Sequence, residues 1–207
     1  MIKNILFDLG GVLLNIDYDA PVKQFEQLGL KDFDQLYTKK SQHKLLDDLE
    51  TGNISPDQFR TELKKHLTSN PTDQQINTAW NSILLDFPTK RMELLKNLKT
   101  HYNILVLSNT NAIHIEGFNQ ILWHTLGIKH LNEVAEHVYF SHEIHQRKPN
   151  EAAFEYVLND AKIEANQTLY IEDSIQHINA AQKMGFQCIH HPTNGDILPY
   201  FDTLLSI

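Results

Sequence analysis

Short apolar segments, rich in β-branched and aromatic residues, recur along the chain, and each one ends at a polar residue. Runs such as Ile104–Leu107 are continuously apolar, which is typical of parallel strands buried on both faces of a sheet. This pattern predicts five strands: Ile2–Phe7, Asn103–Leu107, His137–Ser141, Thr168–Ile171 and Gln187–His190.

Helical spacing separates the later strands. We expect Pro149 in the first turn of a helix that runs through NEAAFEYVL, because proline is well placed there. Ser174 is expected to open another helix, with Ile175 and Ile178 on its apolar face and Gly185 at its end. Strands that alternate with helices predict an α/β fold, with a mostly parallel sheet covered by helices on both faces.

Residues 18–87 break this alternation, since they contain several helix starts and no convincing strand. Two reciprocal capping patterns stand out: Ser55 with Gln58, and Thr72 with Gln75. We therefore predict a small helical module at 18–87, inserted into a core made of residues 1–17 and 88–207. A helix from Thr89 to about Lys99 would lead from the module to the second strand.

Composition and charge narrow the class of protein. The length of 207 residues suits one domain with an insertion, and the net charge of −8 argues against nucleic acids or anionic membranes as partners. The lone Cys188 excludes an intramolecular disulfide and suits a reducing compartment. The apolar run at the N-terminus is too short to span a bilayer and has no cleavage site, so we expect a cytoplasmic protein; the sequence does not indicate the oligomeric state.

Polar residues gather where the predicted strands end. The first strand ends at Asp8, the second at Ser108-Asn109-Thr110 and the fourth at Glu172-Asp173, while Arg147-Lys148-Pro149 follows the third after a short loop. Parallel α/β sheets bind ligands at the carboxyl ends of their strands, so these groups should face one cleft. Carboxylates and a lysine around one cleft suit a Mg²⁺-assisted phosphoryl transfer, in which an Asp can be the covalent acceptor.

This arrangement resembles the haloacid dehalogenase (HAD) superfamily, whose fold is a Rossmann-like sheet with an inserted cap. The resemblance covers nearly the whole chain: FDLGGVL at 7–13, VLSNT at 106–110, QRKP at 146–149, and YIEDS at 170–174 followed by AA…G at 180–185. The helical insertion is similar to a C1-type cap. Among its members, the chain looks most similar to bacterial phosphatases of the α-D-glucose-1-phosphate phosphatase type, which share FDLG, LSNTN and RKP.

The resemblance implies a role for each matched residue. Asp8 would attack phosphorus and become an aspartyl phosphate, which water then cleaves. Asp8, the backbone carbonyl of Gly10 and Asp173 would hold Mg²⁺. The phosphoryl group of a small phosphorylated substrate would be bound by Ser108, by the backbone N–H of Asn109 and by Lys148.

Some positions depart from the family pattern. Most HAD phosphatases carry a second Asp, a general acid and base, where this chain has Gly10, so we expect substrates whose leaving oxygen tolerates negative charge. A sugar 1-phosphate is such a substrate and should react faster than a 6-phosphate. Asp17 is a candidate replacement acid, and Glu172 either supports the metal ligands or is an ordinary loop acid. His145 and His177 replace a frequent Gly and a frequent Asp or Asn.

Two other functions stay open on sequence grounds. One is a metal-independent 2-haloacid dehalogenase, which also lacks the second Asp because halide leaves without a proton. The other is a weakly active protein that binds a phosphorylated ligand or has a regulatory role, which the departures at Gly10, His145 and His177 would favour.

Overall fold

The computed structural model describes residues 1–30 and 44–202. Its centre is a five-stranded sheet in which every neighbouring pair of strands is parallel, with the order β3-β2-β1-β4-β5. All five predicted strands are confirmed: β1 is Asn4–Phe7, β2 Asn103–Ser108, β3 His137–Phe140, β4 Thr168–Glu172 and β5 Gln187–His190.

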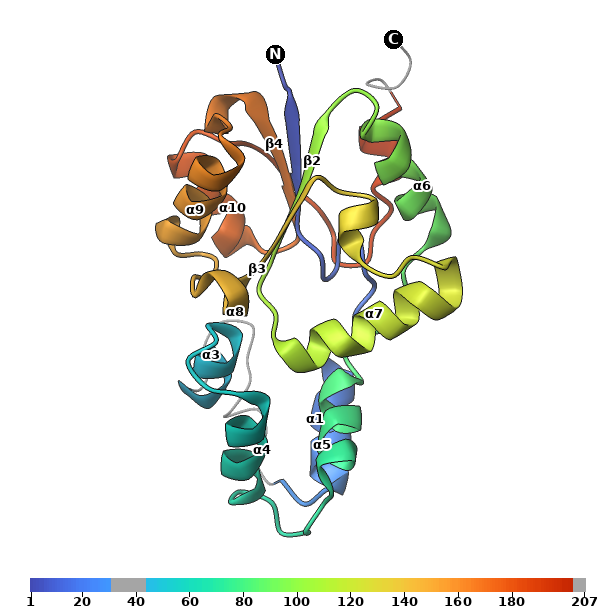
Figure 1. The fold of residues 1–207 in the computed structure, drawn as a ribbon, viewed down its shortest axis with the longest axis vertical. Coiled ribbons are helices and arrows are strands. Elements are labelled where there is room, and N and C mark those ends of the chain that lie inside the picture. Colours follow the sequence, from blue (N-terminus) through green and yellow to red (C-terminus); the bar gives the residue numbers. More distant parts are fainter. Residues whose placement is uncertain (31–43, 203–207) are drawn as a thin grey trace.

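Strand residues alternate between two apolar clusters, one on each face of the sheet. Ile5 and Ile104 belong to the cluster that includes residues of α6 (Thr89–Leu98) and α7 (Ala112–Leu126). Leu6 and Leu105 belong to the cluster with α9 (Glu151–Ala161) and α10 (Ile175–Lys183). Figure 1 shows these helix pairs on opposite sides of the sheet, so the predicted α/β architecture is confirmed.

Several predicted boundaries are wrong in detail. Strand β1 begins at Asn4 rather than Ile2, and β2 and β4 each end one residue later than predicted. Ser141 starts the short helix α8 (Ser141–Ile144) rather than ending β3, because its hydroxyl exchanges hydrogen bonds with the Thr110 backbone. Pro149 does not lie in the first turn of α9, which begins at Glu151 after the N-cap Asn150. Pro149 instead follows Lys148 through a cis peptide bond. The part of the core that the structure describes also contains three short 3₁₀ turns: η1 (Leu131–Glu133), η2 (Ala165–Gln167) and η3 (Leu198–Tyr200).

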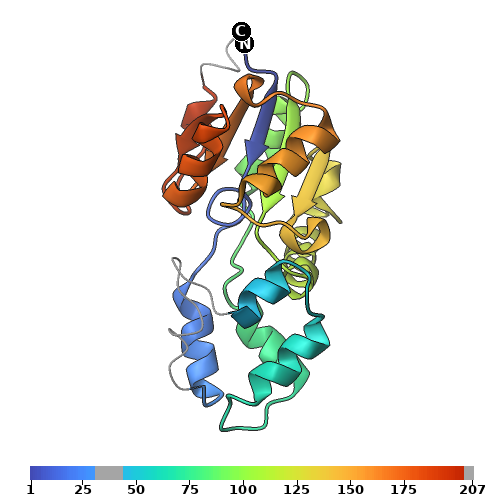
Figure 2. The same cartoon turned by 90° about the vertical axis from the view of Figure 1, so that its left-hand side faces the viewer.

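Within the described residues, four helices form a module beyond the carboxyl ends of the strands: α1 (Asp19–Gln27), α3 (Lys44–Glu50), α4 (Pro56–Lys64) and α5 (Asp73–Asn81). They share an apolar cluster of their own, and Figure 2 shows them gathered at the end of the molecule away from the N-terminus. Both predicted capping boxes are present, Ser55 with Gln58 and Thr72 with Gln75, and they fix the starts of α4 and α5.

The chain enters and leaves the module through two adjacent segments, residues 15–17 and 83–86, which we call the neck. Backbone hydrogen bonds pair them: Asn15 N–H donates to Asp86 O at 2.9 Å, and Asp17 N–H to Ile83 O at 2.9 Å. The Asn194 side chain binds both the N–H and the carbonyl of Ile16. The domain division at 17/18 and 87/88 stays a prediction, and the neck lies beside both of its boundaries.

Among the described residues, none of the helices combines the length and the apolar character that crossing a bilayer requires.

Candidate active site

Strand β1 delivers Asp8 to the carboxyl edge of the sheet. The strand is fully buried, and the Asp8 N–H donates to Ile171 O at 2.9 Å, which continues the pairing with β4. The side chain is fixed as well, because its Oδ1 accepts the Leu9 N–H at 2.7 Å. Asp8 is therefore a rigidly held carboxylate at the rim of a cavity that it lines.

Lys148 is fully buried, and its ammonium group makes three hydrogen bonds. Nζ donates to Asp8 Oδ1 at 2.7 Å, to Leu107 O at 2.8 Å and to Glu172 Oε2 at 2.8 Å. Burial alone would lower the pKa of Lys148, but the charges of Asp8 and Glu172 raise it above its ordinary value. The lysine is a permanent cation between two carboxylates.

Glu172 is not an ordinary loop acid, because its carboxylate is completely buried. Its Oε2 accepts from Lys148 and from the Tyr170 hydroxyl, and its Oε1 accepts the N–H groups of Asp173 and Ser174 at 3.0 Å. Burial opposes its ionisation, but the Lys148 charge holds the pKa of Glu172 well below its usual range. Glu172 therefore fixes both Lys148 and the turn that carries Asp173.

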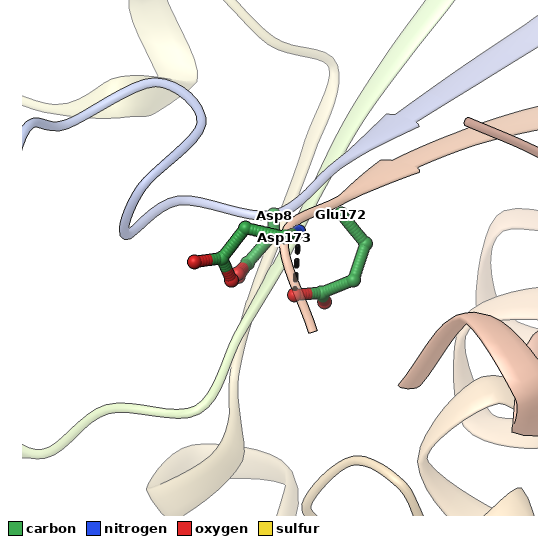
Figure 3. Close-up of side chains that lie close together, drawn as sticks. All are labelled: Asp8, Glu172 and Asp173. Atoms are coloured by element: carbon green, nitrogen blue, oxygen red, sulfur yellow. Dashed lines mark hydrogen bonds between the residues drawn. The ribbon is translucent and has the colours of Figure 1, made fainter. Parts of the chain in front are cut away.

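Asp8 and Asp173 turn their carboxylates toward one another, while the carboxylate of Glu172 lies on the other side of the chain (Figure 3). Each of the three acids offers an oxygen within 4.8 Å of the others, and Asp8 and Asp173 both line the cavity. Burial and the nearby charges of Glu172 and Asp173 raise the pKa of Asp8 well above its usual value, although Lys148 opposes this. A cation between Asp8 and Asp173 would relieve that repulsion.

The two glycines after Asp8 have different surroundings. Gly11 has a φ of +77°, and a Cβ atom there would lie 2.7 Å from Asp173 Oδ2, so the carboxylate occupies the space that a side chain would need. Gly10 lines the cavity, and a Cβ there would meet only Ile16 at 3.4 Å. Position 10 could therefore hold a larger residue, whereas position 11 could not.

The segment after β2 is tied to the Lys148 loop by reciprocal hydrogen bonds. Asn109 Nδ2 donates to Lys148 O at 2.8 Å, and Lys148 N–H donates to Asn109 Oδ1 at 2.9 Å. This leaves the backbone of Asn109, rather than its side chain, for a ligand. Ser108 is buried at the end of β2 and lines the cavity together with Asn109.

The cavity has a volume of about 140 Å³, which is below the roughly 300–1,000 Å³ of sites for drug-sized ligands and suits a small metabolite. Beyond the acids and Lys148, one part of its lining is apolar and includes Ile16, Leu84 and Phe118. The sequence reasoning missed other lining residues, among them Tyr18, Glu50 and His114.

Glu50 reaches the cavity from α3 of the module and contacts the loop that carries Lys148. Arg147 Nη2 lies 2.9 Å from Glu50 Oε2, and Arg147 Nη1 donates to Asp47 Oδ1 at 3.0 Å. His145 Nδ1 also lies 2.8 Å from Thr51 O, just beyond the same helix. No short-range pattern marks Glu50, because its partner lies on a distant segment of the chain.

The structure also places three other sequence candidates, of which only Asp17 lies away from its expected position over the site. Asp17 does not line the cavity, and its Oδ1 accepts the Asp19 N–H at 2.9 Å. His145 points to the module rather than to the acids, in a left-handed backbone conformation with φ of 55°. His177 lines the cavity with Nδ1 3.0 Å from Glu172 Oε2, and burial lowers its pKa.

Comparison with known proteins agrees with this fold. The family model described as "Haloacid dehalogenase-like hydrolase" matches residues 5–190, so the protein is a hydrolase of the α/β class with an inserted module. The chain belongs to the haloacid dehalogenase-like hydrolase family.

Several relatives are similar over nearly their whole length. A D-ribitol-5-phosphate phosphatase of Bacteroides thetaiotaomicron is 30% identical over 94% of each chain. A HAD family enzyme of the same species, in complex with magnesium and inorganic phosphate, has a TM-score of 0.92, 31% identity and coverage of 97% of this chain and 99% of its own. A predicted HAD-like hydrolase of Porphyromonas gingivalis has a TM-score of 0.89 with 29% identity, and covers 100% of this chain and 99% of its own. These relatives do not support the narrower resemblance to glucose-1-phosphate phosphatases.

Proposed function

We propose that the protein is a Mg²⁺-dependent phosphatase that hydrolyses a small sugar or polyol phosphate through an aspartyl phosphate on Asp8. The observation that carries this proposal is the charge arrangement at the rim of the sheet. Lys148 binds Oδ1 of Asp8, and among the described residues no hydrogen bond reaches Oδ2. Oδ2 is therefore the oxygen available to attack a ligand in the cavity.

The donor set fits a magnesium ion. Asp8, Asp173 and the backbone carbonyl of Gly10 would hold it, since Mg²⁺ prefers one or two carboxylates together with phosphate and water oxygens. When bound, the ion would neutralise charge on the phosphoryl oxygens. The relatives that were crystallised with magnesium and phosphate support this assignment.

Each of the groups that line the cavity then has its own role in the reaction. Oδ2 of Asp8 forms a bond to phosphorus as the bond from phosphorus to the ester oxygen breaks, and that oxygen takes its proton from solvent water. Ser108 and the Asn109 N–H bind the phosphoryl oxygens throughout, and the positive charge of Lys148 offsets their negative charge. Water then attacks the phosphorus of the acyl phosphate, which releases inorganic phosphate and restores the Asp8 carboxylate.

The leaving group decides which phosphates react fastest. Gly10 stands where an acid is usual, and Asp17 does not line the cavity. Neither position therefore provides a carboxylic acid that could protonate the leaving oxygen. General acid catalysis contributes roughly 10²- to 10⁴-fold, so its loss favours a sugar 1-phosphate over a 6-phosphate. The relative named for D-ribitol 5-phosphate supports sugar and polyol phosphates as the wider class.

Phosphate release from a substrate panel tests the proposal. The panel contains ribitol 5-phosphate, glucose 1-phosphate, glucose 6-phosphate, a nucleotide and acetyl phosphate, each with Mg²⁺ and with EDTA. We expect Mg²⁺-dependent turnover that the Asp8→Asn variant lacks. Equal rates with glucose 1-phosphate and glucose 6-phosphate would contradict the narrower preference for 1-phosphates.

The same assay separates the other candidate functions. Chloride release from 2-haloacids in EDTA would show a dehalogenase and refute the phosphatase. A rise in melting temperature with a phosphate analogue, without turnover of any substrate, would show a binding protein instead.

A further inference from the structure

His114 lies in the first turn of α7, directly after the polar segment that ends β2. The N-cap Asn111 accepts the N–H groups of Ile113 and His114 at 3.1 Å, which fixes the start of the helix. The His114 ring lines the cavity and stacks on Trp80 of the module, with 4.9 Å between ring centroids and an angle of 14°. Its position in the site is therefore rigid.

Asn81 determines which ring nitrogen of His114 carries the hydrogen. Nδ2 of Asn81 donates to Ile113 O at 3.3 Å, and Oδ1 of Asn81 lies 2.9 Å from His114 Nδ1. The opposite orientation of the amide would place two oxygens against each other, so Oδ1 faces the imidazole. Because an amide oxygen only accepts, Nδ1 of His114 must be the donor and Nε2 holds a lone pair.

Helix α7 is built to admit the Asn81 side chain. Gly117 lies inside this helix, where a Cβ atom would be 2.7 Å from Asn81 Nδ2 and 2.9 Å from Leu84 Cδ1. Glycine in a helix interior costs roughly 1 kcal/mol relative to alanine, so its presence needs a reason. The space that it leaves is filled by the amide that orients His114.

The imidazole is neutral at physiological pH. Burial lowers the pKa of His114 to about 3. Within residues 1–30 and 44–202, no hydrogen bond is made by Nε2, this atom is not fully enclosed in the protein, and His114 lines the cavity. The cavity therefore contains a fixed, uncharged hydrogen-bond acceptor.

We infer that Nε2 of His114 accepts a hydrogen bond from a hydroxyl group on the carbon chain of the substrate. His114 is then a specificity residue, and Asn81 is a positioning residue that acts through it. The apolar wall at Ile16, Leu84 and Phe118 suits the C–H face of such a chain. This inference rests on the proposed function for the class of substrate.

A matched pair of esters separates hydroxyl recognition from catalysis. Ribitol 5-phosphate and pentyl phosphate share a primary leaving oxygen and five carbons, but only the first has hydroxyl groups. We expect His114→Phe, which keeps a ring against Trp80, to lower kcat/KM for ribitol 5-phosphate by roughly 10- to 100-fold. Pentyl phosphate should change less than about 3-fold, and His124→Phe, an exposed position of the same helix, should leave both values unchanged.

Equal losses with the two esters, or no loss with ribitol 5-phosphate, would overturn the inference. Asn81→Leu provides a second variant that keeps His114, and it should weaken the preference for ribitol 5-phosphate because the tautomer is no longer fixed. Failure of the wild-type protein to release phosphate from any ester would count against the proposed function instead.

A binding measurement decides the inference independently of turnover. The ¹⁵N resonance of His114 Nε2 is followed in Asp8→Asn protein during titration with ribitol 5-phosphate, glucose 1-phosphate and pentyl phosphate. A shift with ribitol 5-phosphate or glucose 1-phosphate, but not with pentyl phosphate, supports the inference. No shift with either hydroxylated ester, or the same shift with pentyl phosphate, overturns it.

Discussion

The Lys148 side chain neutralises two acids that burial would otherwise make very costly. Its Nζ lies 2.7 Å from Asp8 and 2.8 Å from Glu172, and neither Lys148 nor Glu172 has an exposed side chain. Removing one member of such a cluster leaves an uncompensated buried charge, which typically costs about 3–5 kcal/mol. Lys148 therefore contributes to folding as well as to chemistry.

We predict that Lys148→Met lowers the free energy of unfolding by roughly 3–5 kcal/mol at neutral pH. Adding Glu172→Gln to this variant should recover part of the loss, because one of the unpaired charges is removed. Urea denaturation measures both variants. A Lys148→Met protein as stable as the wild type would show that the acids are not charged in the folded state.

The adjacent glycines provide a matched comparison. Gly11→Ala forces a left-handed φ on alanine, at roughly 1–2 kcal/mol, and its Cβ would displace the Asp173 carboxylate. Gly10→Ala has space against Ile16. We predict that Gly11→Ala weakens Mg²⁺ binding at least 10-fold by calorimetry, while Gly10→Ala stays within about 3-fold. The reverse order would refute the assigned roles of the two positions.

The sequence predicts single residues well when the strand ends locate them. Asp8, Ser108, Lys148 and Asp173 all line the cavity, as their positions after apolar runs implied. The role of Glu172 could not be predicted, because it depends on hydrogen bonds to a lysine from another loop. His114 had a local signal, since it follows the Asn111 N-cap at the carboxyl end of a strand.

Helix α7 shows a conflict between local preference and packing. Alanine is the better helix former, but at position 117 its methyl group would lie 2.7 Å from Asn81. We predict that Gly117→Ala destabilises the protein by roughly 1–3 kcal/mol through overpacking. Gln120→Ala, at an exposed position of the same helix, should stay within about 0.5 kcal/mol by urea denaturation. A more stable Gly117→Ala protein would show that the contact with Asn81 relaxes freely.

Element boundaries are predictable where a local interaction sets them. The capping boxes of α4 and α5 need only residues three apart, so Ser55 and Thr72 could be assigned from sequence. The start of α8 could not be, because the Ser141 hydroxyl binds the backbone of Thr110 on another segment. The position of Pro149 outside the helix could not be predicted for the same reason, because the side chain of Asn109, on another segment, binds the backbone of Lys148.

The whole molecule brings three buried acids to one edge, so its stability should respond to a divalent cation. Burial and the neighbouring carboxylates raise the pKa of Asp8, and a proton on Asp8 competes with the metal. The protonated form of Asp8 is thus favoured at low pH and is lost as the pH rises through this raised pKa. Metal binding should strengthen over that range.

We predict that Mg²⁺ raises the melting temperature more at pH 8 than at pH 5. At a concentration about 100 times the Kd at pH 8, binding adds roughly 2.7 kcal/mol, or about 5–10 °C for a chain of this size, and the same concentration adds less at pH 5 because the Kd is higher there. Differential scanning calorimetry measures the shift, and Asp173→Asn provides the control without a complete ligand set. An equal shift at both pH values would contradict a raised pKa at Asp8.

For the whole molecule, the sequence predicts the arrangement of the sheet and the helices but not the shape of the cavity. The parallel sheet and the helical insertion follow from periodicity and capping. The cavity needs side chains from the strand ends, from the neck, from α3 and from α7, and no local pattern indicates how these segments meet. The contact between Arg147 of the core and Glu50 of the module could not be predicted, because the two residues lie far apart along the chain.

The neck has a consequence for how such a protein can change over generations. The reacting groups come from strand ends of the core, whereas Ile16, Ile83 and Leu84 line the same cavity from the neck. Because the neck segments are held side by side by backbone hydrogen bonds, their side chains can be replaced without altering that pairing. Mutations in the neck can therefore change which compound the enzyme accepts, while the groups that carry out the reaction stay the same.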